Sequence, residues 1–340
     1  MRNTSSAYKK QIKGIREFCA KIIINYADGS TQTLTDLQDF KQLKFVEECS
    51  GSSEFEALIT LNNRTGKFDG KNFYGAHISA YVGILVDGKP ELLEMGHYIV
   101  DEPVSPGISI ALTAYDNMIL LEKAYVPGIT YPATLGNITK DICAQCGVIL
   151  ESSDFPRNSY VVESAPENAT CREVLAAAAQ LAGCFAKARA NGRIAIAWYA
   201  AASSLTVDTL RNKSICTDDV TITGITVSKG ESAAQAGADG YRLSIIDNIL
   251  LEESKIQEMA NYLASKLVAI LPPTVGIVPI RPIHRGGRPH HDQGWRCNVC
   301  NSSNIDYFCS FGSTEGGLQC SVANSECRQE AFRNIKSNYC

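Results

Sequence analysis

The chain has 340 residues, of which 45% are hydrophobic and 20% charged, so it can bury sizeable cores, and its length suggests two or three domains. The net charge of −4 offers no basic surface for nucleic acid. No apolar run approaches the roughly 20 residues that a membrane span needs. The N-terminus has no apolar segment of the signal-peptide kind, which predicts synthesis and retention in the cytoplasm.

The first part of the chain has the alternating pattern of strands. Residues 1–16 are polar and predict a short arm or helix. Asp87-Gly88 separates two strand patterns and is a strong hairpin signal. The predicted strands are residues 19–26, 53–62, 77–86, 91–100 and 108–114. Residues 17–120 therefore predict a β-domain with a barrel-like or sandwich-like form.

Residues 121–205 predict a small helix-hairpin module. Thr134 is an N-cap for an amphipathic helix that ends before Gly147. Thr170 to Glu173 is a capping box that opens a second helix, which ends before Gly183. Asn191-Gly192 then indicates a hairpin. Two helices and a hairpin make a compact α+β module.

Residues 206–283 predict a second β-segment followed by a helix. Residues 220–228 and 241–246 are the predicted strand partners. Residues 252–270 predict the longest helix of the chain, and Pro272-Pro273 ends it. Its predicted buried face consists of Ile256, Met259, Ala260, Leu263 and Leu267. The fold class is therefore α+β and multidomain, with the helix-hairpin module inserted between β-domains.

An ordered set of motifs in residues 17–283 resembles the hub proteins of bacteriophage tails. The chain is similar to the baseplate hub and tail-associated family of Gram-positive-type phages, prophages and tailocins. The motifs are Ala114-Tyr115-Asp116 at a strand end, Thr134-Leu135-Gly136 and Cys146-Gly147 around the first helix, Thr170 to Leu175 in the second, Arg189 to Ile194 in the hairpin, and Asn248 with Ala260 to Leu263 in the last helix.

This resemblance implies an architectural protein of the virion tail and not an enzyme. The family forms a ring, as a homotrimer, at the tail tip. The ring connects the tail tube or distal tail protein to a spike or fibre protein, and contact with a tape-measure protein is also implied. The resemblance implies no cofactor, no sequence-specific nucleic acid and no membrane span. Such a particle is made in the bacterial host cytoplasm.

The cysteines divide into two groups. Cys19, Cys143, Cys146, Cys184 and Cys216 lie in apolar patterns and predict small buried side chains. The CxxC pair Cys143 and Cys146 falls at the C-terminal end of a predicted helix, the wrong pole for stabilising a thiolate, which favours a core role.

Residues 284–340 form a Cys-rich tail with six of the thirteen cysteines and three of the five histidines. One interpretation is a zinc site, whose candidate ligands are Cys297, Cys300, Cys309 and Cys320. The spacing lacks a second CxxC or HxxxH pair, which argues against a zinc site. A third hypothesis is that the chain after about His284 is partly translated out of frame, because a one-base shift can restore the Asp-Pro and Gly-Asp steps that the hub family carries next. Such a tail would have no evolved function.

Other patterns argue against catalysis. The sequence has no GxSxG nucleophile elbow, P-loop or dinucleotide-binding fingerprint. The acidic pairs Asp101-Glu102, Asp218-Asp219 and Glu252-Glu253 predict solvated faces, and His77 and His97 predict structural roles. Two alternatives to the hub remain: a tail-associated cell-wall peptidase, which would need a constellation in the Cys-rich tail, and an adhesin that binds host glycans.

Overall fold

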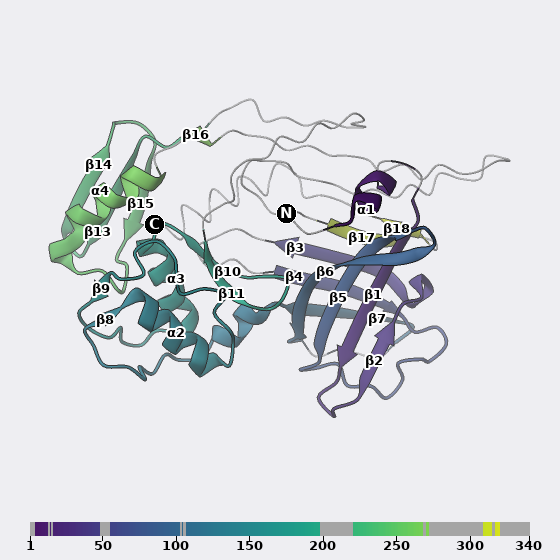
Figure 1. Cartoon of the computed structure of the whole chain (residues 1–340). Coiled ribbons are helices and arrows are strands. Elements are labelled where there is room, and N and C mark those ends of the chain that lie inside the picture. The colour runs from purple at the N-terminus through teal and green to yellow at the C-terminus, as the bar shows by residue number, and fades with distance from the viewer. Residues whose placement is uncertain are drawn as a thin grey trace.

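The computed structural model describes residues 4–12, 14, 16–47, 55–102, 104, 107–197, 220–267, 270–271, 309–314 and 317–319. These residues form an α+β structure, mostly sheet with few helices, as the sequence predicted. Figure 1 shows two parts beside each other. We call residues 18–115 the sandwich and residues 116–267 the α+β half. None of the described helices is long and apolar enough to span a membrane.

A short helix, α1 (Ser6–Gln11), precedes the sandwich and accounts for the predicted arm or helix. Ser5 caps it and also bonds Glu91 through its backbone N–H and its hydroxyl, which ties the helix to the sheet. The elements of the sandwich are β1 (Phe18–Asn25), β2 (Thr31–Leu34), the 3-10 turn η1 (Leu37–Asp39), β3 (Phe40–Glu47), β4 (Phe55–Asn62), β5 (His77–Val86), β6 (Lys89–Val100) and β7 (Ser109–Tyr115).

These strands belong to one nine-stranded sheet with the order β18-β17-β3-β4-β7-β6-β5-β1-β2. Two strands from the predicted Cys-rich tail, β17 (Cys309–Thr314) and β18 (Gly317–Gln319), extend it beyond β3. The order is open, with β18 and β2 at its ends. Of the two predicted forms, the sandwich is therefore the one observed, and the barrel does not close.

The sheet folds over itself where β6 meets β7. These two strands pair at only two positions, Ile99 with Tyr115 and Val100 with Ala114. The strands on the β7 side of this corner and those on the β6 side form two layers that face each other. Phe45 of β3 stacks on Tyr98 of β6 across the layers, with ring centroids 5.7 Å apart. The apolar side chains of both layers meet between them, so the core lies inside the fold of the sheet.

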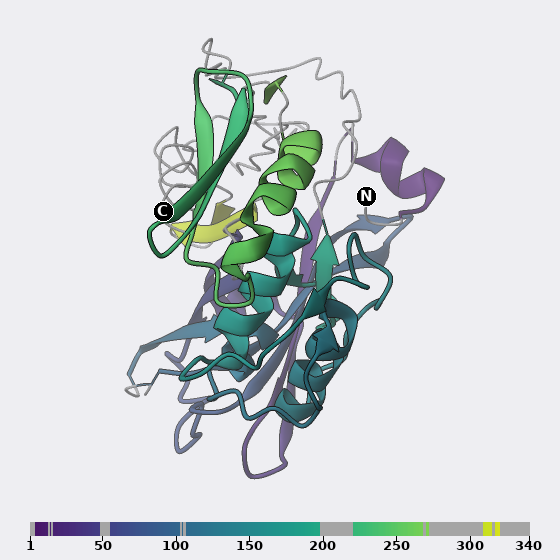
Figure 2. The same cartoon turned by 90° about the vertical axis from the view of Figure 1, so that its left-hand side faces the viewer.

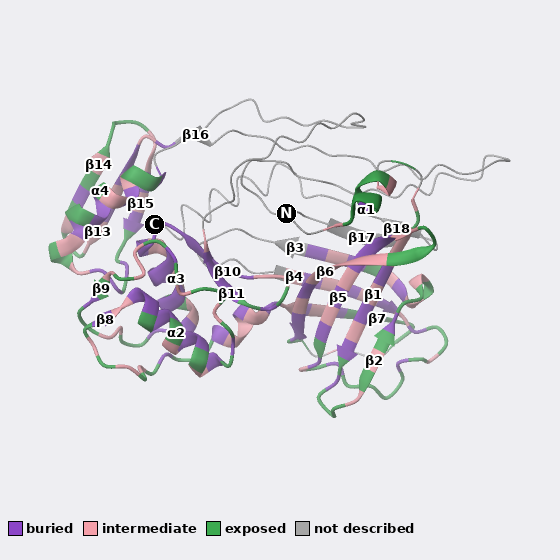
Figure 3. Cartoon of the chain, in the orientation of Figure 1, coloured by how far each residue is buried: buried purple, intermediate pink, exposed green. Residues whose placement is uncertain are grey.

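Strand periodicity explains which residues enter this core. Ala57, Ile59 and Leu61 of β4 are buried at every second position, as predicted. β1 and β7 also bury every second residue along most of their length, and Figure 3 shows buried residues interrupted by more exposed ones along the sandwich strands. Asp87 and Gly88 both have positive φ, 50° and 75°, which is the type I′ turn that this dipeptide predicts between β5 and β6.

The α+β half carries the remaining elements. They are the 3-10 helix η2 (Asn117–Leu121), β8 (Ala133–Thr134), α2 (Leu135–Cys146), β9 (Val161–Val162), α3 (Cys171–Leu181), β10 (Phe185–Ala188), β11 (Ile194–Ala197), β12 (Val220–Thr221), β13 (Gly224–Lys229), β14 (Ser232–Gly237), β15 (Arg242–Ile246), the 3-10 turn η3 (Glu253–Lys255), α4 (Ile256–Leu267) and β16 (Ile270–Leu271).

The predicted helix signals of this half are confirmed. Thr134 caps α2, and Gly147 ends it with φ 67°. The capping box of α3 is complete, because the Thr170 hydroxyl accepts from the Glu173 backbone N–H while the Glu173 carboxylate accepts from the Thr170 backbone N–H. The predicted hairpin is formed by β10 and β11.

Two predictions for residues 220–270 need correction. The last helix is not the longest, because Glu253–Lys255 form a 3-10 turn and α4 begins at Ile256, which leaves it 12 residues long, the length of α2. Its buried face is the predicted one. The strands β13 and β15 pair as predicted and run parallel, but the single strand predicted over residues 220–228 is divided into β12 and β13. The unpredicted β14 lies on the other side of β13.

Side-chain hydrogen bonds join α4 and its sheet to α3. The hydroxyl of Tyr262 donates to Ala182 O at 2.9 Å, and Asn248 Nδ2 donates to Ala177 O at 3.0 Å. Figure 2 shows α4 beside α3, and the buried apolar residues of the whole α+β half form one cluster. The division into domains at 121–205 and 206–283 stays a prediction.

Candidate functional site

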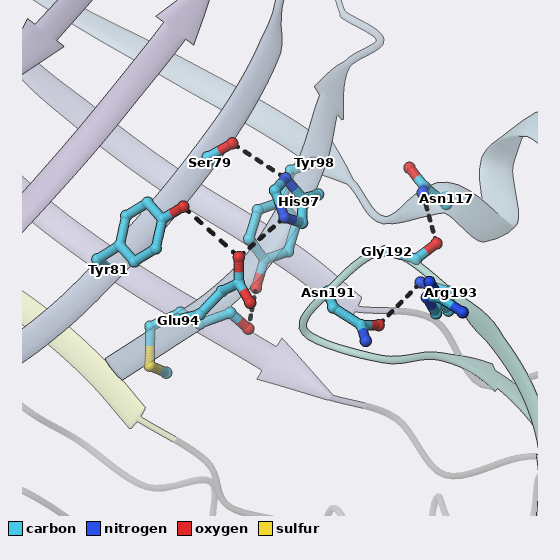
Figure 4. A network of polar contacts seen from close by, with 10 residues as sticks. Ser79, Tyr81, Glu94, His97, Tyr98, Asn117, Asn191, Gly192 and Arg193 are labelled. Carbon is cyan, nitrogen blue, oxygen red and sulfur yellow. Dashed lines mark hydrogen bonds and ion pairs between the residues drawn. The ribbon is translucent and has the colours of Figure 1, made fainter. Parts of the chain in front are cut away.

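A polar network lies where the hairpin of the α+β half meets the outer face of the sandwich. We call this network the seam, and it consists of Ser79 and Tyr81 from β5, Glu94 and His97 from β6, Asn117 from η2, and Gly192 at the hairpin tip. Figure 4 shows these side chains converging from both halves of the molecule. The seam therefore joins parts of the chain that are up to 113 residues apart in sequence, from Ser79 to Gly192.

His97 is held from both sides of its ring. Its Nδ1 lies 3.0 Å from Ser79 Oγ, and its Nε2 lies 3.0 Å from Glu94 Oε1. The Tyr81 hydroxyl donates to the same carboxylate oxygen at 3.5 Å. Burial raises the pKa of Tyr81, and the Glu94 carboxylate raises it further. These contacts fix the imidazole plane against the sheet.

A β-bulge brings Glu94 and His97 together. Residues three apart on a regular strand point to opposite faces. The register between β5 and β6 shifts after Ala80, so that Ala80 pairs with Gly96 while Tyr81 pairs with Glu94. Because the bulge adds one residue, Met95, to β6, the side chains of Glu94 and His97 point to the same outer face of the sheet. The sequence predicted a structural role for His97 but not its contact with Glu94, because the bulge is not apparent from the strand pattern.

The hairpin tip docks directly on this face. Asn117 Nδ2 donates to Gly192 O at 2.7 Å. Gly192 has φ 75°, and a Cβ there would lie 2.8 Å from Asn117 Nδ2 and 3.6 Å from His97 Cδ2. The position therefore needs glycine both for its backbone conformation and for the close approach. The loop is a three-residue type with glycine in the left-handed position, and Asn191 Oδ1 accepts from the Arg193 backbone N–H.

The order Ser79, His97, Glu94 matches the nucleophile, base and carboxylate of a hydrolytic triad in its distances. Its setting differs from such a site. Ser79 lies within β5 and pairs with Ile23 of β1 on one side and His97 of β6 on the other. Because the backbone amides of a central strand are used by the ladder, this position supplies no free N–H for an oxyanion. The contacts are those of a structural hydrogen-bond network.

The five cysteines whose side chains the structure describes are reduced, and four of them are buried. Cys143 and Cys146 lie in the core as predicted, and Cys184 does too. Cys19 is only half-buried on β1, which corrects the prediction of a core side chain. Burial raises the pKa of Cys143 to about 12 and that of Cys184 to about 11, which makes both poor nucleophiles.

The zinc candidates cannot be placed as a group. Cys297, Cys300 and Cys320 lie outside the described residues, and only the backbone of Cys309, at the start of β17, is described. Cys216 and the pair Asp218-Asp219 also lie outside them. Within the described ranges no three His, Cys, Asp or Glu side chains come together in a way that could hold a metal ion. The acidic residues Asp101, Glu102 and Glu253 are exposed, and Glu252 is half-buried.

No protein-family model and no curated protein matches this chain. Among solved structures, it is similar to the 43 kDa tail protein of prophage MuSo2 from Shewanella oneidensis, with 14% identity, a TM-score of 0.48, and coverage of 90% of this chain and 97% of that chain. It is also similar to a tail protein from Neisseria meningitidis MC58, with 12% identity, a TM-score of 0.45, and coverage of 88% and 94%.

A third similar structure is the Francisella PdpA–VgrG complex, with 11% identity, a TM-score of 0.43, and coverage of 94% of this chain and 57% of that chain. The structural neighbours thus include proteins described as phage or prophage tail proteins. The narrower resemblance to hubs of Gram-positive-type phages stays a prediction.

Proposed function

We propose that this chain is the structural hub at the tip of a phage tail or of a phage-derived contractile particle. It forms a homotrimeric ring that connects the tail tube or distal tail protein above to a spike or fibre protein below, and the tape-measure protein contacts it inside the tail. The motif resemblance supports membership of the Gram-positive-type family in this proposal. In this proposal the protein is made in the host cytoplasm, acts in the virion tail and needs no cofactor.

The observation that carries this proposal is the way the hub-like motifs fold. The strand ending at Tyr115 is followed directly by η2. The turn of the hairpin, which follows Arg189, contacts this junction through the hydrogen bond from Asn117 to Gly192. A subunit that transmits load through a ring needs its parts to move together. A hydrogen-bonded seam between the sandwich and the α+β half supports that role.

The sandwich also offers an edge through which copies could pair. β2 is the terminal strand on one side of the sheet. Tyr26 N–H donates to Ser30 O, so the hydrogen-bonded pairs with β1 include Gln32, while the backbone groups of Thr31 and Thr33 point away from β1. Exposed edge groups of this kind pair readily with another chain. In our proposal this edge contributes to the ring.

The decisive experiment measures the mass of the full-length chain by light scattering, alone and mixed with the tail tube or distal tail protein of the same particle. We expect a trimer, or a complex of threefold-compatible stoichiometry. A monomer that ignores both partners would contradict the hub. Partner-dependent assembly is also expected of ring subunits whose interfaces are completed by a neighbour.

A variant pair tests the edge itself. Thr33→Pro removes one outward N–H and leaves the pairing of β2 with β1 intact, because proline is tolerated at strand edges. Thr33→Ala keeps the N–H and is the matched control. We expect the proline variant to lose the ring and the alanine variant to keep it. Equal assembly of both variants would place the ring contact on another surface.

The proposal includes the absence of catalysis, and the seam gives a direct test. A fluorophosphonate probe should leave Ser79 unlabelled, as judged by mass spectrometry of the full-length protein. Labelling of Ser79 that disappears in a His97→Ala variant would instead identify a serine hydrolase and contradict a purely structural role.

A further inference from the structure

Two buried thiols meet at the interface of α2 and α3. Cys146 is the last residue of α2, and Cys171 is the first residue of α3. Their side chains are joined by a hydrogen bond. Both lie in the hydrophobic cluster of the α+β half, with 5% and 0% of their surface exposed. Neither side chain is required by the proposed ring, so their pairing needs a separate explanation.

The backbone around the two thiols is well anchored. Cys171 N–H donates to Lys123 O at 2.8 Å, and Ala124 forms a β-bridge with Thr170. At the other side, Val148 N–H donates to Cys143 O at 3.0 Å and closes the end of α2. The backbone is therefore held in place on both sides of the hydrogen-bonded thiol pair. To form a disulfide, the two sulfurs must approach to about 2.05 Å.

We propose that Cys146 and Cys171 form a disulfide when the protein enters an oxidising environment, and that this bond fastens α2 to α3. The oxidant is a low-molecular-weight disulfide. Thiolate attack first makes a mixed disulfide and releases one small thiol. The second cysteine then attacks the protein-bound sulfur, the S–S bond of the protein forms, and a second small thiol leaves. Two protein thiols are oxidised and one external disulfide is reduced.

The surroundings explain why the reduced form is the one observed. Burial raises the pKa of Cys171 to about 12, and the hydrogen bond that its S–H donates to Cys146 raises it as well. Thiolate is therefore scarce at neutral pH, and oxidation waits for the helix ends to open. A reducing cytoplasm would keep the pair as thiols, and an extracellular setting would let it close. The disulfide itself does not depend on the hub proposal.

The experiment maps the cysteines of the full-length protein after incubation with oxidised glutathione in native buffer. Free thiols are alkylated in denaturant, and tryptic peptides are identified by mass spectrometry. Trypsin separates Cys146 from Cys171, because it cuts after Lys140, Arg157 and Arg172. We expect peptides 141–157 and 158–172 to appear as one cross-linked species that a reductant divides.

Matched variants assign the bond. Cys146→Ala should abolish the cross-link, whereas Cys143→Ala and Cys184→Ala should retain it. Oxidised wild-type protein should also unfold at a higher temperature than the reduced form, and a reductant should reverse this shift. Recovery of the two peptides as separate alkylated species, a Cys143–Cys146 link within one peptide, or pairing of Cys171 with any other cysteine would overturn the proposal. None of these readouts involves assembly, so failure of the hub leaves the test intact.

Discussion

The sandwich and the α+β half bury their cores by different means. The sandwich uses long strands with large apolar side chains, including the ring contacts of Tyr26 with Phe73 and of Phe45 with Tyr98. The α+β half packs aliphatic side chains together with alanines and thiols, such as Ala178 and Cys143, and adds side-chain hydrogen bonds from Asn248 and Tyr262. Small side chains let helices approach closely, but they bury little area each, so individual polar contacts carry more of the stability there.

This difference predicts that alkaline pH unfolds the α+β half before the sandwich, which is the largest effect we expect. Burial raises the pKa of more groups in the α+β half: Tyr125, Tyr131, Cys143, Tyr160, Cys171, Cys184 and Tyr262. In the sandwich the corresponding groups are Cys19, Tyr26 and Tyr81.

The sign follows from which state ionises first. The folded chain keeps these groups neutral, whereas the unfolded chain ionises its thiols near 9.0 and its phenols near 10.0. Their contribution to stability is therefore complete below pH 9.0 and is lost as pH rises towards the folded values of about 12 for Cys143 and Tyr160. Far-UV circular dichroism under reducing conditions should show the helical signal disappearing before the sheet signal. Simultaneous loss would mean that the two cores unfold as one unit.

The next largest effect is expected from truncating Tyr98, which lies in the core of the sandwich. This side chain is 1% exposed, and its ring lies over Gly96, where a Cβ would come within 2.6 Å. Tyr98→Ala should lower the free energy of unfolding by about 3–5 kcal/mol, as expected for truncating a buried aromatic residue.

Tyr98→Phe is the control, since it keeps the ring and removes the hydroxyl that donates to Met95 O, at a cost of about 1 kcal/mol. Denaturant unfolding would measure both variants. If the halves are separate cooperative units, only the sheet transition moves. A matching fall in the helical transition would show that the seam couples the two cores.

The sequence predicted the fold class and most of the elements because their signals are local. Caps, the Asp87-Gly88 turn and period-two burial depend on neighbouring residues, and each was found as expected. Strand β14 was missed because Ser232–Gly237 is rich in alanine and has no strand pattern, so its pairing with β13 is imposed by tertiary contacts.

The seam was not predictable for a related reason. Glu94 and His97 share a face only through the register shift at Met95, and Asn117 meets Gly192 across 75 residues of sequence. Neither contact produces a periodic pattern in the sequence. The sequence prediction of a structural role for His97 agrees with its contacts, but its partners could be found only in three dimensions.

A smaller effect is expected from Asn248, which joins the β15 region to α3. Its Nδ2 donates to Ala177 O and to Gln180 Oε1, and its Oδ1 accepts from Leu250 N–H. Asn248→Ala should cost about 1–3 kcal/mol, because it leaves buried groups without their partners. The exposed Asn261, changed to alanine, is the control. Hydrogen exchange should show α4 opening more often in the first variant, and unchanged protection would mean that apolar packing alone holds α4 to α3.

The smallest effect is expected at the start of α3, where the capping box can be divided into its two halves. Thr170→Ala removes the acceptor for the Glu173 N–H and should cost about 1 kcal/mol. Glu173→Gln keeps an oxygen that can accept from Thr170 N–H, so it should cost much less. Thermal unfolding of the two variants would measure the difference.

Since Cys171 follows the cap directly, Thr170→Ala should also speed oxidation of the Cys146–Cys171 pair by fraying the helix end. Destabilisation without faster oxidation would mean that the thiols open through α2 and not through α3.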